Sequence, residues 1–172
     1  MDKNMASLSI RPINSLLLNT YKSPPAIYAS YSSTQTQNIT QNQVLPLVYN
    51  TEDISASGIR CTLPSANIYI LESGVYKVLA SLQCDRNAAG AASINMYPSI
   101  NGVAVPNSAT RVVINQNLES LMTVEWYLNI LQGQYITIDT FSTATGARAL
   151  AVAASNPVPL IPSIITTIMK IS

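Results

Sequence analysis

Acid–base or covalent chemistry in this chain would have to come from its eight carboxylates and two cysteines, because the sequence contains no histidine. This removes the Ser-His-Asp and Cys-His arrangements, the commonest general base and the usual zinc ligand. The carboxylates are scattered over Asp2, Glu52, Asp53, Glu72, Asp85, Glu119, Glu125 and Asp139. Neighbours on a strand point apart, so the adjacent pair Glu52-Asp53 would not act together. A carboxylate pair assembled by folding, as in glycoside hydrolases, stays open, but the expectation is a protein that is not an enzyme.

The sequence offers no cofactor motif and no metal-ligand spacing. It lacks the glycine patterns of phosphate-binding and dinucleotide-binding loops. Calcium could use loop oxygens around Asp53 or Asp85, but solvated loop residues are the better interpretation of these scattered acids. Cys84 falls in phase with the core face of its strand, so a buried free thiol is expected, and a Cys61–Cys84 disulfide stays possible in an oxidising compartment. We expect no cofactor and no bound metal.

The charge pattern speaks against nucleic acid and membrane surfaces as partners. Charged residues make up 10% of the chain and the net charge is +1, against about 25% charged residues in typical soluble domains. The lysines and arginines are single and scattered, so no cluster could neutralise several phosphates or anionic lipids. Asparagine, glutamine, serine and threonine supply the polar surface instead.

Neither a signal peptide nor a membrane span is expected. The apolar run Leu16-Leu17-Leu18 is too short for the hydrophobic part of a leader. The uncharged stretch 149–169, "ALAVAASNPVPLIPSIITTIM", carries three prolines near its middle that would break a spanning helix. Two strands joined by a proline-rich turn explain it better.

The chain divides into two parts at Pro24-Pro25. Residues 1–25 lack sustained periodicity and are expected to form an extended N-terminal arm, whereas residues 26–172 form the domain. The arm is expected to dock the protein onto neighbours. Its candidate docking residues are the apolar side chains Ile10, Leu16, Leu17, Leu18 and Tyr21.

From residue 26 onward the sequence alternates between short strand-like runs and turn signals, with no convincing helix. Asn50-Thr51-Glu52-Asp53 is predicted to be a turn, and Asn101-Gly102 is a strong hairpin signal because both residues accept positive φ. The predicted strands are 26–31, 44–49, 67–71, 74–84, 93–100, 103–105, 109–114, 121–131, 134–141, 147–154 and 160–171. Such spacing predicts an all-β, antiparallel jelly-roll sandwich of about ten strands.

Several pieces of the sequence resemble one superfamily in matching order. They are "LPLVYNTEDISASGI" (45–59), "GVYKVLASLQC" (74–84), "SINGVAV" (99–105), "NILQGQYITIDTF" (129–141) and "IITTIMKI" (164–171). Together they resemble the jelly rolls of tumour necrosis factor (TNF) and of the complement globular head. The resemblance covers residues 26–172, and Gln134 stands where an aspartate is common. It implies a ten-stranded jelly roll that trimerises tightly. Members serve as receptor ligands, recognition heads, spore-surface proteins, and capsid or fibre parts of viruses.

Some of the predicted strands are apolar on both faces. In 121–131, one side carries Met122, Trp126 and Leu128, and the other carries Leu121 and Tyr127. A strand of a monomeric sandwich should alternate between core and solvent, so its second apolar face needs a cover. An identical subunit is the expected cover. The residues predicted to line a three-fold interface are Tyr97, Tyr127, Tyr135 and Phe141.

Three functions fit these features. The first is a structural protein of a virus particle (a minor capsid, decoration or fibre-head subunit) that forms a homotrimer and contacts other capsid or fibre proteins through its arm. Such a protein would be made in the host cytoplasm and end in the virion. The second is a recognition head that binds a receptor or glycan through loops such as 86–92 or 142–147. The third is a bacterial or spore-surface protein of the same fold. The viral assignment rests on analogy with the fold.

Overall fold

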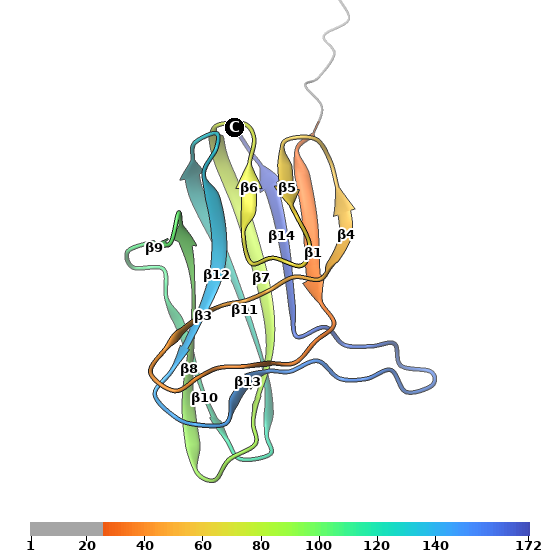
Figure 1. The fold of residues 1–172 in the computed structure, drawn as a ribbon, viewed down its shortest axis with the longest axis vertical. Helices are drawn as coiled ribbons and strands as arrows, with labels where there is room; N and C mark the ends of the chain where they lie inside the picture. The colour runs from red at the N-terminus through yellow and green to blue at the C-terminus, as the bar shows by residue number, and fades with distance from the viewer. Residues whose placement is uncertain (1–25) are drawn as a thin grey trace, which may run out of the picture.

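Residues 26–172 form a sandwich of two antiparallel β-sheets without a helix in that range, as described by a computed structural model (Figure 1). The expected all-β jelly roll is confirmed. The expected arm residues Ile10, Leu16, Leu17, Leu18 and Tyr21 lie outside the described residues. The strands are β1 (Tyr28–Ser33), β2 (Gln37–Asn38), β3 (Val44–Pro46), β4 (Thr51–Ser55), β5 (Ile59–Cys61), β6 (Ile68–Ile70), β7 (Gly74–Arg86), β8 (Ala91–Ile100), β9 (Val103–Ala104), β10 (Thr110–Asn115), β11 (Glu119–Ile130), β12 (Tyr135–Ser142), β13 (Ala147–Ala149) and β14 (Ile164–Lys170).

The first sheet, sheet A, is built around the long strand β7. Strand β11 pairs along nearly the whole of one side of β7, from Gly74 to Asp85. On the other side, β14 pairs with residues 76–82 and β13 with residues 84–86. Strands β1 and β4 follow β14 outward, and β2 follows β13. Strand β11 is therefore one edge of sheet A, and β4 is the opposite edge.

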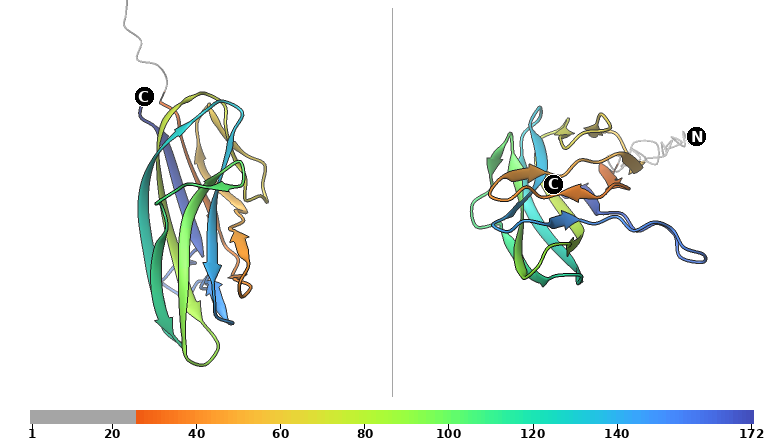
Figure 2. Two further views of the ribbon diagram at one scale, coloured as in Figure 1. Left: turned by 90° about the vertical axis from the view of Figure 1, so that its left-hand side faces the viewer. Right: turned by 60° about the horizontal axis from the view of Figure 1, so that its bottom comes forward.

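The second sheet, sheet B, has β8 and β12 at its centre. Strand β8 carries β10 and the short β9 on the side away from β12. Strand β12 carries β6 and β3 on its other side, and β5 pairs with β6. The left view of Figure 2 shows the two sheets as stacked layers.

The core lies between the sheets and follows the alternation of the strands. All five even-numbered residues of β7 from Tyr76 to Cys84 are fully buried, which confirms the face predicted from "GVYKVLASLQC". In β12, Ile136 and Ile138 point into the core, as expected from the same period of two. The phenol of Tyr49 lies at 2.7 Å from the hydroxyl of Thr166 in the buried interior, so the loop after β3 is fixed to sheet A by a hydrogen bond.

Both ends of the described chain lie at one end of the sandwich. Tyr28 pairs with Met169, and the last residues continue beside β7, where Val75 N donates to Ser172 O at 3.0 Å. The β7–β8 loop and the β10–β11 turn lie at the opposite end (Figure 1). The predicted Asn-Gly turn is confirmed, since Asn101 and Gly102 adopt φ of 51° and 76° between β8 and β9.

The sequence-based strand assignments differ from the structure in the first third of the domain. The predicted turn at residues 50–53 is wrong, because Thr51–Ser55 form the edge strand β4. Two of its residues are acidic, a composition that is disfavoured in strand centres and common on edges. The segment 160–171 begins its regular strand only at Ile164, and 147–154 ends its strand at Ala149.

Candidate interaction surfaces

The outer face of sheet A is an exposed surface with several large apolar side chains. It is formed by the odd-numbered residues of β7, β11 and β14, because their even-numbered neighbours fill the core. Register places Met169, Lys77 and Tyr127 in one row across the three strands. Leu121 is 65% exposed and Tyr127 is 61% exposed. Other exposed apolar side chains on this face or at its margin are Leu131, Ile165, Met169 and Ile171.

A small charged cluster lies within this face. The ammonium of Lys77 lies 2.6 Å from the carboxylate of Glu125, and the phenol of Tyr127 donates to the same carboxylate at 2.5 Å. The hydrogen bond from Lys77 holds the pKa of Glu125 below its usual value, and the Glu125 contact raises the pKa of Lys77 and of Tyr127. The charges of Lys77 and Glu125 are thus paired, so covering them with an uncharged surface costs less desolvation energy than covering unpaired charges would.

The outer face of sheet B carries aromatic side chains around a polar centre. Tyr135 lies against Tyr69, with ring centroids 5.6 Å apart. Asp139 lies opposite Tyr97 in the ladder and accepts a hydrogen bond from Ser99 at 2.6 Å. Asp139 is only 5% exposed, and its Oδ1 has no hydrogen-bond partner among the described residues. Burial and the nearby Asp139 charge raise the pKa of Tyr97.

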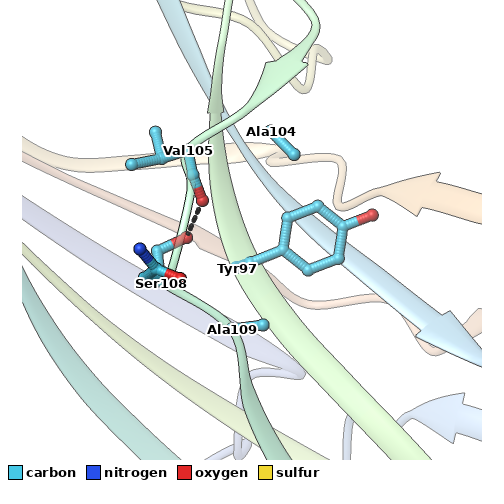
Figure 3. A pocket seen from close by; sticks show the side chains of 6 residues that line it. Tyr97, Ala104, Val105, Ser108 and Ala109 are labelled. Atoms are coloured by element: carbon cyan, nitrogen blue, oxygen red, sulfur yellow. Dashed lines mark hydrogen bonds between the residues drawn. The ribbon is translucent and has the colours of Figure 1, made fainter.

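An open pocket of about 440 Å³ lies beside Tyr97 (Figure 3). The loop after β9 forms its other wall, with Val105, Asn107 and Ser108. Ser108 is held from two directions, because its hydroxyl donates to Val105 O at 2.7 Å and its carbonyl accepts from the indole of Trp126 at 2.9 Å. The pocket is lined mainly by small side chains, so the Tyr97 ring is its largest contact surface.

The loops proposed for recognition meet at one end of the sandwich. Asn87 N donates to Gly146 O at 3.0 Å, which joins the 86–92 and 142–147 loops. The buried guanidinium of Arg86 donates from Nε to Thr145 O, while Arg86 O accepts from Asn117 N in the β10–β11 turn. Arg86 therefore ties three connections together, while its buried Nη1 has no hydrogen-bond partner among the described residues.

The residues considered for metal or redox chemistry are used structurally. Among residues 26–172 no group of three or more cysteine or acidic side chains gathers as a metal site. Asp85 is not a solvated loop residue as predicted: it lies in β7, buried, and is paired with Arg148. Asp53 lies in β4 and accepts from Ser32 at 2.9 Å. Cys61 and Cys84 are free and buried, and burial raises the pKa of each thiol to about 11.

The four residues predicted for a trimer interface do not form one patch. Tyr127 lies on the outer face of sheet A, whereas Tyr97, Tyr135 and Phe141 lie on the outer face of sheet B. Their role in an interface remains a prediction. A heterologous interface joins different surfaces of neighbouring copies, so residues on two faces could both take part. Sequence reasoning missed Ile165 and Met169, although the alternation of "IITTIMKI" could have placed them on the same outer face.

Comparison with solved structures identifies the fold. The globular domain of zebrafish complement 1qA superposes with a TM-score of 0.57 at 11% identity, covering 85% of this chain and 98% of that domain. The chain has the TNF-like and C1q-like jelly-roll fold. Eiger TNF from S. frugiperda matches with a TM-score of 0.55 at 10% identity, covering 87% of this chain and 94% of that one. Murine APRIL at pH 5.0 also gives 0.55, at 8% identity over 86% of this chain and all of the other.

The likeness lies in the structure alone. No protein-family model matches the sequence, and no curated protein matches it. The resemblance inferred from the ordered motifs is nevertheless confirmed at the level of the fold. Among residues 26–172 there is also no helix with the length and hydropathy needed to cross a bilayer.

Proposed function

We propose that this protein is a non-catalytic assembly protein that forms a homotrimer through the outer face of sheet A, and that the trimer is a structural part of a virus particle. The observation that carries the trimer is the exposure of Leu121, Tyr127 and Met169 on one sheet face. Apolar side chains of this size gathered on one face usually mark a protein interface. The trimeric state of the TNF and C1q proteins that share the fold supports a homotrimer of this chain.

The viral setting is the wider part of the proposal. It is supported by the low charge of the chain, by its neutral polar residues and by the use of the fold in capsid and fibre proteins. In this role residues 1–25 contact other capsid or fibre proteins, and the protein is made in the host cytoplasm before it enters the virion. Electron microscopy of particles labelled with an antibody to this chain tests the setting. Label confined to material outside particles contradicts it.

Light scattering of the purified full chain tests the trimer. The expected mass is three times the 18.5 kDa of one chain. Ile165→Arg places a charge on the outer face of sheet A and should shift the chain toward monomer. Val103→Arg is the matched control, because Val103 is exposed on the β8–β9 hairpin of the other sheet. A monomeric full chain, or equal effects of the two variants, contradicts the proposed interface.

The open pocket beside Tyr97 favours a second function, recognition of a glycan. An aromatic ring offers a stacking surface for a sugar, and the amide of Asn107, which also lines the pocket, is a group that binds sugar hydroxyls. Binding of the full chain to immobilised glycans should then be lost in Tyr97→Ala and retained in Tyr127→Ala. Equal binding by both variants removes this function.

A further inference from the structure

The segment between β13 and β14 forms a hairpin that projects from the body of the molecule. Residues 150–162, the projecting hairpin, extend on the side of β1 and β4 and away from β8 and β10 (Figure 1 and the right view of Figure 2). Its two arms are held by bridges between Val152 and Ile161 and between Ser155 and Val158. Every residue from 153 to 161 is exposed.

The composition of the projecting hairpin is unusual for such an exposed element. There is no charged residue between Arg148 and Lys170. Val158 is 49% exposed, and Leu160 and Ile161 are exposed beside it. Exposed edges and hairpins of monomeric proteins usually carry charges that prevent association, and an isolated two-stranded hairpin is marginally stable in water. Its exposed, uncharged and apolar residues are therefore typical of a segment that is buried against another protein surface.

The base of the projecting hairpin lies at a defined level of sheet A. Leu150 N donates to Gln83 O at 2.9 Å, and Gln83 N donates to Ser163 O at 2.9 Å. Gln83 of β7 thus receives both arms of the hairpin. On the other side of β7, the register partner of Gln83 is Leu121 of the edge strand β11. Leu121 and the base of the hairpin therefore lie at the same level along β7, on opposite sides of that strand.

The region around Leu121 can accept an uncharged partner. Leu121 and Leu118, here called the edge patch, are both more than half exposed, and Leu118 belongs to the turn that leads into β11. Glu119 lies between them in the sequence, and its carboxylate accepts from the amide of Gln83 at 3.2 Å. The edge patch is apolar apart from the Glu119 carboxylate, which is bonded to the neutral amide of Gln83, and the hairpin carries no charged residue.

We propose that the projecting hairpin of one copy of this chain packs on the edge patch of the next copy. The hairpin base and the edge patch lie at the same level along β7 and on opposite sides of that strand, so a rotation about an axis parallel to β7 turns the hairpin of one copy toward the edge patch of the next. Such a heterologous contact repeats in every subunit of a closed ring. The inference rests on the proposed homotrimer and adds to it: the outer face of sheet A is the main contact, and the hairpin is a clasp between neighbours.

Photo-crosslinking of the full chain tests the clasp directly. Benzoylphenylalanine at position 158 should give an intermolecular adduct that mass spectrometry maps to residues 118–121. The same probe at position 103, an exposed valine in the hairpin of the other sheet, is the matched control and should give none there. Adducts confined to the same chain, or mapped to another region of the neighbour, overturn the inference.

A binding measurement separates this inference from the proposed function. Val158→Arg combined with Leu160→Arg should raise the concentration for half-dissociation about tenfold, the effect of losing one apolar contact cluster. Leu118→Arg, in the part of the edge patch outside β11, should act in the same direction, while Val103→Arg should leave it unchanged. These hairpin residues lie outside the core, and near-ultraviolet circular dichroism verifies that the variants fold. A trimer unaffected by the hairpin substitutions overturns the clasp alone. A full chain that is monomeric overturns the homotrimer and the clasp together.

Discussion

Arg148 of β13 lies directly opposite Asp85 of β7 and donates both Nε and Nη2 to its carboxylate, with the Nε contact at 2.9 Å. The carboxylate is mostly buried, with its side chain 10% exposed, whereas the guanidinium is 25% exposed. Hydrogen bonding to Asp85 raises the pKa of Arg148 further above its usual value. Strand β13 has only three residues, so this pair is a principal side-chain link between β13 and the centre of sheet A.

Asp85→Asn is expected to destabilise the protein because it leaves the Arg148 charge without its partner. The expected loss in the free energy of unfolding is about 2–4 kcal/mol, below the value for a fully buried pair because water reaches the guanidinium. Urea unfolding measures the loss. Glu125→Gln is the matched control, since the Lys77–Glu125 pair is exposed and should matter little. Equal effects of the two substitutions would show that burial does not set the strength of the Asp85 pair.

The hydrogen bond between Tyr49 and Thr166 supports a second stability prediction. Tyr49→Phe leaves the fully buried hydroxyl of Thr166 without a partner and should cost about 1–3 kcal/mol in the free energy of unfolding. Thr166→Val removes the other hydroxyl at nearly constant volume. The double variant should be less destabilised than the sum of the two single variants, because neither polar group remains unpaired. Additive losses in chemical denaturation would refute the coupling.

The turn between β8 and β9 predicts a cost for replacing Asn101. Asn101→Ala puts alanine at a φ of 51° and removes the acceptor for Tyr135 N, whose bond to Asn101 Oδ1 measures 3.0 Å. The two effects together should lower the free energy of unfolding by about 1–2 kcal/mol. Asn129→Ala, at an exposed position of β11, is the control and should change stability by less than about 0.5 kcal/mol. Thermal unfolding of both variants checks the difference.

Buried thiols and phenols predict a loss of stability in alkaline solution. Burial raises the pKa of Cys61 and Cys84 from 9.0 to about 11, and raises the pKa of Tyr31 to about 12. The unfolded chain therefore releases these protons at lower pH than the folded chain. Stability is full below the unfolded thiol value and should fall as pH rises from about 9 to about 11, because the unfolded state then binds fewer protons.

Urea unfolding at a series of pH values measures this decline. Cys84→Ala should make the decline of the unfolding free energy with pH shallower, since one thiol no longer ionises. The variant should be less stable than the wild type at neutral pH, so the slopes with pH are compared rather than the absolute values. The folded wild-type protein should also react slowly with a thiol reagent at neutral pH and quickly after unfolding. Constant stability up to about pH 11 would contradict the assignment of these groups as buried and neutral.

The alternation of residues predicted much of the fold because the sheets obey a period of two. The core face of β7 follows from "GVYKVLASLQC", where the side from Tyr76 to Cys84 is apolar throughout, and the core face of β12 follows from the alternating Ile136 and Ile138. The Asn101-Gly102 turn was predictable for a different reason, since few residue pairs accept two successive positive φ angles. Local chemistry determined both features.

Features that depend on the assembly of distant segments could not be predicted in the same way. Thr51–Ser55 has the composition of a turn, and it is a strand because β1 offers it an edge to pair with. Tyr97 and Tyr127 both point outward from their strands, but the sequence does not tell which sheet each strand joins. The projecting hairpin was expected only as a proline-rich turn, and its reach beyond the sheets depends on Val152 and Ile161 pairing outside them.

The pairing of Tyr28 with Met169 gives the jelly roll a polarity. Residue 26 and Ser172 leave the sandwich at one pole, so whatever precedes the domain and any tag fused after Ser172 are attached on the same side. The opposite pole carries the connections tied together by Arg86, and neither residue 26 nor Ser172 lies there. A protein fused after Ser172 would therefore lie at the pole of residue 26, and the loops of the other pole would face away from a support to which Ser172 is fixed.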